Sequence, residues 1–245
     1  MKKLLAVLLA VMLLPGCKAE TAPSEPVSTA SKPTQATTEG TKPPVVVSPL
    51  AVEDFLDFEN ASYPREKPVE FVMIHFTSAV MLDRENPYDY DLVRGIFEDN
   101  RLGIHYIIDR DGTIYCFLPE SRSAWHAGKG SFGDEKYTDN MNRHSIGIEL
   151  MAIGSQEDMS IYLNPEEYHR LNKDLIGFTD AQYTALTALV RDICARHEIA
   201  LDRQHIIGHQ EYNPAKNDPG ELFDWAHFMD ILTAKKFLKN NEKSS

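Results

Sequence analysis

Two of the nine histidines in this 245-residue chain stand where side chains commonly do chemistry. His75 lies at the end of an apolar run over residues 69–76, and His209 opens a polar segment with proline and glycine that extends to residue 220. Binding and catalytic groups concentrate on the loops that follow strands. Two imidazoles and one carboxylate can bind a catalytic zinc ion and leave its fourth position for water. The turn-rich loop after His209 can return Asp218 to the same metal, so these three residues are candidate ligands.

A second interpretation stays open on the residues alone. The separation of His75 and His209 is not a local metal motif such as HExxH, and a lone histidine at a strand end is commonly a packed or surface residue. Glu149 alternates with the apolar Ile148 and Leu150, so it points to the opposite side of its strand. It is either a group that works beside a metal or a solvated strand residue. Residue types permit a zinc site here without requiring one.

Strand and helix signals alternate along the part of the chain that carries these residues. β-Branched and aromatic runs predict strands over 69–76, 104–109, 113–118, 145–151 and 204–208. Helical spacing and capping signals predict helices over 89–100, from 164, over 179–197 and from 225 to about 239. The capping box of Thr179 with Gln182 is the clearest of these signals. The elements predict a single α/β domain of mixed, α+β-like type, with a central mixed sheet flanked by helices and the zinc site in a cleft at the strand ends.

The first sixteen residues have the form of an export signal. Lys2 and Lys3 precede an apolar run over residues 4–14, which is too short for a bilayer span of about 20 residues. Cys17 follows where a bacterial lipoprotein signal places its lipid-modified cysteine, and an ordinary signal peptide is the alternative. We therefore expect a lipid-anchored, extracytoplasmic protein of the bacterial cell envelope. The membrane would be the outer membrane facing the periplasm or the outer face of the cytoplasmic membrane.

Residues 17–60 are interpreted as a tether that links the lipid to a folded domain. The stretch up to residue 49 is dominated by Thr, Ser and Pro and buries too little apolar surface to order itself, although patterning begins near residues 52–58. Residues 61–240 are expected to form the folded domain. Within it, residues 152–178 are too long for an ordinary connection and are interpreted as an insertion.

Composition excludes several classes of protein. The chain has 25 basic and 37 acidic residues, a formal net charge of −12, which argues against a nucleic-acid partner. Hydrophobic residues make up 42% of the chain, enough for a packed core. Three cysteines are too few for a disulfide scaffold or a four-cysteine zinc site, and whether Cys116 and Cys194 pair is left open. We expect a monomer.

Five blocks of the chain form a set: VMIHFT (72–77), IHYIIDRDG (104–112), AWHAG (124–128), SIGIEL (145–150) and GH with KNDPG (208–209 and 216–220). Together they resemble the zinc-dependent N-acetylmuramoyl-L-alanine amidases of type 2, and they stand in that family's order between about residues 63 and 225. The family includes phage amidase lysozymes, bacterial muropeptide amidases and animal peptidoglycan recognition proteins. The acidic third ligand and the carboxylate of the GIE strand look most like the bacterial muropeptide branch, which has anchored lipoprotein members.

The resemblance implies a role for each candidate residue of the metal site. His75, His209 and Asp218 would bind Zn²⁺. Glu149 would be the acid/base that takes the proton of the attacking water, and Lys216 would stabilise the oxyanion. Residues 152–178 are longer than the compact members of the family need, which supports the insertion and leaves its role open.

The resemblance also implies a substrate and the residues that bind it. Trp125 and His126 would line the cleft for the peptide stem, with Asn142 nearby. The reaction would be hydrolysis of the amide between N-acetylmuramic acid and L-alanine in peptidoglycan or muropeptides, for cell-wall turnover or remodelling. The alternatives are a non-catalytic peptidoglycan-binding lipoprotein and a zinc peptidase that acts within the stem peptide.

Overall fold

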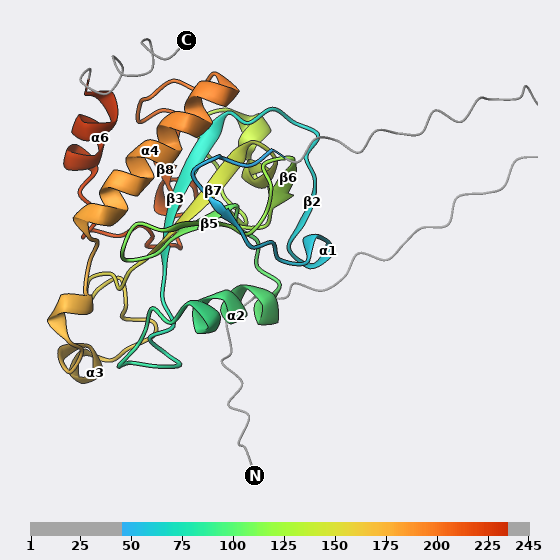
Figure 1. The fold of residues 1–245 in the computed structure, drawn as a ribbon. Coiled ribbons are helices and arrows are strands. Elements are labelled where there is room, and N and C mark those ends of the chain that lie inside the picture. The colour runs from blue at the N-terminus through green and yellow to red at the C-terminus, as the bar shows by residue number, and fades with distance from the viewer. Residues whose placement is uncertain (1–45, 235–245) are drawn as a thin grey trace, which may run out of the picture. The chain divides into compact units, whose positions relative to one another are not determined.

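A mixed six-stranded β-sheet lies at the centre of the folded chain (Figure 1). The computed structural model describes residues 46–234. In spatial order the strands are β1 (Val52–Glu53), β5 (Ile114–Cys116), β4 (Tyr106–Ile108), β7 (Ser145–Met151), β3 (Phe71–Thr77) and β8 (Ile206–Gly208). Strands β4 and β5 are antiparallel, and the other neighbouring pairs are parallel. The predicted mixed sheet is confirmed, and a separate antiparallel pair joins β2 (Ser62–Pro64) to β6 (Arg122–Ala124).

Capping residues mark the first turns of the two helices for which the sequence carries a capping signal, α3 (Pro165–His169) and α4 (Asp180–His197). Thr179 and Gln182 form the predicted capping box at the start of α4. A second box, made by Asn164 and Glu167, starts α3. The other helices are α1 (Phe58–Ala61), α2 (Tyr90–Asn100), α5 (His209–Tyr212) and α6 (Trp225–Thr233), with 3₁₀ turns η1 (Glu135–Tyr137), η2 (Met141–Arg143) and η3 (Lys173–Leu175).

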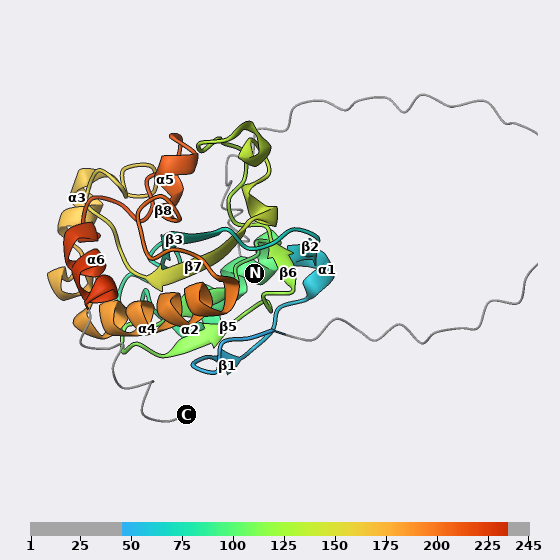
Figure 2. The same cartoon turned by 90° about the horizontal axis from the view of Figure 1, so that it is seen from above.

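The two faces of the sheet pack against different parts of the chain. Side chains such as Ile74 and Ile148 join the core under α4 and α6. The alternate side chains of these strands point to the other face, because successive residues of a strand alternate. There Met73 packs with Tyr212 of α5. Figure 2 shows α4 on one side of β3 and β7 and α5 on the other. His75, two residues after Met73 in β3, shares the face of α5, which begins at His209.

The folded domain begins earlier than the sequence predicted. Residues 52–53 form β1 against β5, the Leu56 amide donates to the Phe117 carbonyl, and the Leu56 side chain is buried. The Val46 carbonyl already accepts from the Glu120 amide. The predicted end of the tether at residue 60 is therefore wrong, because residues 46–60 complete the edge of the sheet. The predicted signal peptide, Cys17 and the rest of the tether lie outside the described residues.

The predicted insertion, residues 152–178, carries α3, η3 and a small apolar cluster of its own. Met159, Leu163 and Leu171 are buried there against Val80, which comes from the loop after β3. Elsewhere, Cys116 and Cys194 are buried and free. Between residues 46 and 234 no helix is both long and apolar enough to cross a bilayer.

Candidate metal centre

Three parallel strands bring the candidate ligands together. In the register of β3 and β7, His75 stands opposite Glu149. On the other side of β3, Ile74 stands opposite Gly208, so His209 at the start of α5 comes next to His75. The two imidazole rings have their centroids 4.6 Å apart. Sheet register therefore places three candidate functional side chains in one row across the sheet.

The loop after α5 returns Asp218 to these histidines. His75 Nδ1 lies 2.6 Å and His209 Nδ1 lies 3.0 Å from Asp218 Oδ2. One possible ligand atom from each residue lies within 4.8 Å of the other two. The Gln210 amide donates to the Asp218 carbonyl at 3.0 Å, which closes the loop on the end of β8. The structure thus brings together all three predicted ligands.

The far nitrogen of each histidine ring fixes its tautomer. His209 Nε2 lies 2.9 Å from the Ala127 carbonyl, so this nitrogen must carry the proton and donate it. For His75, Nε2 lies 3.0 Å from His126 Nδ1. His126 Nε2 in turn lies 3.1 Å from Ser145 Oγ, whose hydroxyl donates to the Met141 carbonyl. Ser145 Oγ therefore accepts from His126, His126 Nδ1 accepts from His75, and both His75 and His209 keep Nδ1 unprotonated.

The donor set fits a divalent cation. Nδ1 of His75, Nδ1 of His209 and Oδ2 of Asp218 face one another, and none of the three carries a proton. Each can therefore donate its lone pair to a bound cation. Burial lowers the pKa of His75 to about 4, against the opposing effect of its contact with Asp218. Neutral imidazoles and an ionised carboxylate are the forms that bind metal.

Glu149 lies beside this cluster without joining it. It is half-buried on β7, and its Oε2 is buried with no hydrogen-bond partner in residues 46–234. Burial raises the pKa of Glu149 well above its ordinary value; the Asp218 charge adds to this and the Lys216 charge opposes it. A carboxyl group with a raised pKa and a free oxygen next to a metal site is suited to accept and return a proton.

Lys216 is exposed on the loop that carries Asp218. Its ammonium is close enough to lower the pKa values of both His75 and Glu149. The structure therefore places an exposed positive charge near the site, two residues from one ligand. Such a group can stabilise negative charge that develops on a substrate.

The residues predicted for the peptide-stem cleft occupy three different environments. Trp125 is half-buried, its ring lies 6.2 Å from that of Tyr63, and its Nε1 has no partner in the described part of the chain. His126 points inward and supports His75. Asn142 Oδ1 accepts from the amides of His126 and Ala127 at 3.1 and 2.7 Å, so it holds the loop behind the metal site. Contact of these three with substrate stays a prediction.

Several residues that shape the site carry no sequence signal. Ser145 begins a predicted strand, and nothing in its context indicates that it fixes the tautomer of His126 and, through it, that of His75 on the neighbouring strand. His105 shares the family block but takes no part as a ligand, because its Nδ1 accepts from the Gly147 amide and its Nε2 faces the Arg122 carbonyl. The sequence indicated the candidate ligands, but it did not indicate the residues that fix their tautomers.

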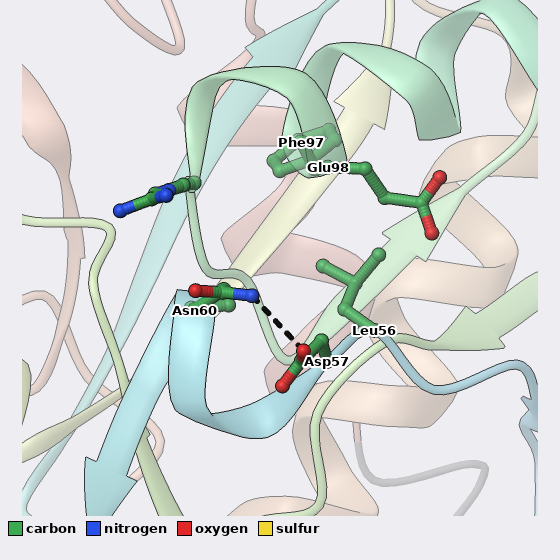
Figure 3. Close-up of a pocket in the computed structure, with 7 residues that line it drawn as sticks. Leu56, Asp57, Asn60, Phe97 and Glu98 are labelled. Carbon is green, nitrogen blue, oxygen red and sulfur yellow. Dashed lines mark hydrogen bonds between the residues drawn. The ribbon is translucent and has the colours of Figure 1, made fainter.

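A separate hollow lies at the junction of α1 and α2 (Figure 3). It has a volume of about 140 Å³ and is lined by Leu56, Asp57, Asn60, Ala61, Phe97, Glu98 and Arg101. The Asn60 amide donates to Asp57 there, at 2.9 Å. None of the candidate metal ligands borders this hollow, so it is distinct from the site.

Comparison with known proteins adds an independent observation. The family model described as N-acetylmuramoyl-L-alanine amidase matches residues 65–221, a range that includes all three candidate ligands and Glu149. The chain belongs to this amidase family. Membership agrees with the donor set, and it confirms the resemblance that the five sequence blocks indicated.

Two curated relatives of this chain are named as amidases. It is 33% identical over 135 residues to the 1,6-anhydro-N-acetylmuramyl-L-alanine amidase AmpD of Citrobacter freundii, which covers 54% of the chain and 58% of that protein. The chain thus matches little more than half the length of this curated relative. It is 29% identical over 183 residues to AmpD of Haemophilus influenzae, covering 69% of the chain and 85% of that protein.

Two solved structures share the fold of this amidase chain. A crystal structure of an AmpD derivative superposes with a TM-score of 0.52 at 25% identity, covering 76% of the chain and 96% of that structure. The amidase AmiD from Escherichia coli, solved with anhydro-N-acetylmuramic acid-L-Ala-D-gamma-Glu-L-Lys, gives a TM-score of 0.51 at 28% identity. That match covers 69% of the chain and 58% of AmiD.

Proposed function

We propose that this protein is a zinc-dependent N-acetylmuramoyl-L-alanine amidase. Its substrate is the amide bond between N-acetylmuramic acid and L-alanine in peptidoglycan or in muropeptides released from it. The observation that carries the proposal is the set of two buried histidines, His75 and His209, with the half-buried Asp218, beside the unpartnered Oε2 of Glu149. Family membership and the names of the AmpD relatives support the choice of bond.

His75 and His209, through Nδ1, and Asp218, through its carboxylate, would hold the zinc ion. Bound there, zinc supplies a Lewis acid that polarises the scissile carbonyl and lowers the pKa of water. The Ala127 carbonyl and the Ser145–His126 pair keep both imidazoles in the tautomer that this requires. The charge of the site is thereby fixed before substrate arrives.

The remaining groups handle protons and charge. Glu149 accepts a proton from the attacking water, whose oxygen adds to the carbonyl carbon. Lys216 stabilises the negative charge that develops on the carbonyl oxygen. When the carbon–nitrogen bond breaks, Glu149 returns the proton to the departing amine of L-alanine. The products are a free carboxyl group on the lactyl side and a free peptide, so atoms and protons balance.

The test is release of free stem peptide from a defined muropeptide by the purified chain loaded with zinc. We expect the mass of a peptide that begins with L-alanine, and we expect EDTA to stop its release. Glu149→Gln should lower kcat by at least about 100-fold, because it removes the general base, and should leave zinc content unchanged because Glu149 is not a ligand. Substrate binding without hydrolysis by the zinc-loaded wild type would favour a binding protein. A fragment cut within the stem would favour a peptidase. Either result would overturn the proposal.

We further propose that Cys17 carries lipid and holds the enzyme at the bacterial envelope. The proposal rests on the basic start, the short apolar run and the position of the cysteine. Cys17→Ser should move the protein from the membrane fraction of the producing bacterium to the soluble fraction. A wild-type chain found free of lipid by intact-mass measurement would contradict it.

A further inference from the structure

One wall of the candidate site is built by the predicted insertion. Residues 155–163 form two tight turns. In the first, the Ser155 amide donates to the Asp158 carboxylate and the Asp158 amide donates to the Ser155 hydroxyl. In the second, the Met159 carbonyl accepts from the amides of Tyr162 and Leu163. Met159 and Leu163 are buried in the apolar cluster that also includes Phe76, the residue after His75. These anchors hold the turns against the end of β3.

The same turns contact the loop that carries Asp218. Asn217 Nδ2 donates to the Asp158 carbonyl at 3.3 Å. Gly220 has φ +79°, and a Cβ there would lie 2.4 Å from Asp158 Oδ2, so only glycine permits this approach. The segment 155–163 is therefore fixed on two sides of the metal centre, next to His75 and next to Asp218.

Tyr162 is the aromatic residue that this wall presents. It lies between the two buried anchors, yet 42% of its surface is exposed, and its hydroxyl makes no hydrogen bond within residues 46–234. Burial of the phenol raises its pKa, and the charges of Asp218 and Glu149 raise it further. A half-exposed ring with a free hydroxyl can offer both an apolar face and a hydrogen-bond donor to a ligand.

The two walls of the site differ in charge. Residues 152–178 carry five acidic and two basic residues, and Glu157 and Asp174 are exposed there without a basic partner among the described residues. The opposite wall, residues 125–131, contacts His209 through the Ala127 carbonyl and carries Lys129 and no acidic residue. A peptide joined to muramic acid through its amino end presents carboxylates, whereas the sugar is uncharged. Electrostatic complementarity places the peptide toward residues 125–131 and the sugar toward the insertion.

We propose that Tyr162 is a substrate-binding residue that contacts the sugar ring of N-acetylmuramic acid. The inference rests on the proposed amidase function and assigns a purpose to the insertion. The ring of Tyr162 packs against the apolar face of the sugar and its hydroxyl donates to a sugar oxygen. The insertion thereby selects for a complete muramoyl group rather than for the lactyl-peptide alone.

The test measures binding on the full-length, zinc-loaded chain that carries Glu149→Gln, so that neither ligand is hydrolysed. The two ligands share one peptide: N-acetylmuramoyl-peptide and lactoyl-peptide, which lacks the sugar. Tyr162→Ala should weaken binding of the muramoyl ligand about tenfold, which corresponds to about 1.4 kcal/mol, and leave the lactoyl ligand unchanged, since only the muramoyl ligand has a sugar for the ring to contact. Tyr162→Phe, which keeps the ring, should lose less. Ile161→Ala is the matched control, because Ile161 is 75% exposed on the same turn, and it should change neither affinity.

The outcomes separate the two proposals. If wild type hydrolyses muropeptides but Tyr162→Ala weakens neither ligand, or weakens both equally, the Tyr162 assignment is wrong and the amidase proposal stands. If wild type releases no peptide and Glu149→Gln protein binds neither ligand, the amidase proposal fails and the assignment fails with it. Thermal melting of each variant confirms that the fold is kept.

Discussion

At the scale of single residues, the metal centre depends on groups that never touch the metal. His75 can offer Nδ1 because its other nitrogen donates to His126, and His126 can accept because its own far nitrogen keeps its proton and donates it in a hydrogen bond to Ser145. The Met141 carbonyl ends this series by accepting from Ser145. Each bond removes one alternative tautomer, so the ring is oriented and protonated correctly before any ion binds.

Ser145→Ala should therefore weaken zinc binding although Ser145 is no ligand. Loss of an orienting hydrogen bond typically lowers metal affinity about 10–100-fold. Titration against a competing chelator measures the change. Ser123→Ala is a suitable control, because Ser123 is equally buried but its hydroxyl has no partner in residues 46–234. Equal zinc affinity of Ser145→Ala and wild type would remove this hydroxyl from the metal site.

Lys216→Met should move the pH profile of the reaction. The Lys216 charge lowers the pKa of Glu149, so its removal raises that pKa. Because the base must be ionised to accept a proton, the acid limb of kcat/KM should shift to higher pH, and the maximum should fall about 100-fold through loss of oxyanion stabilisation. Lys129→Met, which removes an exposed lysine of the opposite wall, should leave the position of the acid limb unchanged. An unshifted limb in Lys216→Met would show that Lys216 does not act on Glu149.

The sequence revealed the candidate ligands because residue type and position limit metal binding strongly. Histidines at a strand end and at the start of a turn-rich loop are recognisable before the fold is known. The direction of His126 was not recognisable, since both an outward and an inward ring satisfy the same pattern. Tyr162 was missed for a different reason: its turns have no periodicity, and contacts with residues distant in the sequence, such as that between Asn217 and Asp158, bring them to the site.

At the scale of elements, α4 supports the sheet from behind the site. Thr179 accepts from the Gln182 amide and donates to the Arg110 carbonyl at 2.8 Å, so one hydroxyl caps the helix and ties it to the β4–β5 turn. Gln182 is buried and donates to the carbonyls of Ile108 and Met151. The start of this helix is thus bonded to two strands of the sheet.

Thr179→Ala should lower the free energy of unfolding by about 1–2 kcal/mol, because it removes a cap and a second hydrogen bond together. Chemical denaturation measures the loss. Thr184→Ala serves as control, since Thr184 is exposed on the same helix and its hydroxyl bonds only the carbonyl of Asp180, four residues back. A loss no greater than that of the control would mean that the cap contributes nothing to stability.

The observed ends of helices and strands agree with the predicted ones where residues close in the sequence determine them. Strand β7 and the start of α4 agree with prediction, because an apolar run and a capping box are local signals. The hairpin strands are shorter than predicted, since the His105 carbonyl accepts from both the Phe117 and Leu118 amides and the regular ladder ends there. The early start of the fold depends on pairing of β1 with β5, more than 60 residues away in the chain, which no local pattern contains.

At the scale of the whole molecule, a buried carboxylate joins the N-terminal segment to the domain. Glu120 accepts hydrogen bonds from Tyr106, Arg196 and His197, and its own amide donates to the Val46 carbonyl. Burial acts to raise the pKa of Glu120, but the hydrogen bonds from Arg196, His197 and Tyr106 outweigh it and lower the pKa to about 2.

Because the pKa of Glu120 is lowered in the folded protein, the free energy of unfolding decreases as the pH falls through the acidic range. In the unfolded chain the carboxyl titrates near 4.5, so its contribution is complete above that pH and is lost as pH falls toward about 2. Glu120→Gln should cost about 1.5–3 kcal/mol at neutral pH, because it weakens the charged hydrogen bonds from Arg196 and His197 while Arg196 keeps its ion pair with Asp192, and should flatten the pH dependence between these values. Denaturant unfolding at several pH values measures both effects. An unchanged acid limb in the variant would assign the acid sensitivity to other carboxylates.

The order of strands in the sheet also determines how the domain bears mechanical load. The chain enters through β1 at one edge, whereas β7, β3 and β8, which position the candidate metal ligands, lie toward the other edge. A pull applied at residue 46 acts first on the hydrogen bond between the Val46 carbonyl and the Glu120 amide and then on β1, whose pairing with β5 involves only residues 52 and 53. This outer strand would detach before tension reached β3. The protein can therefore be fixed to a support by its N-terminus and still keep the geometry of its metal centre.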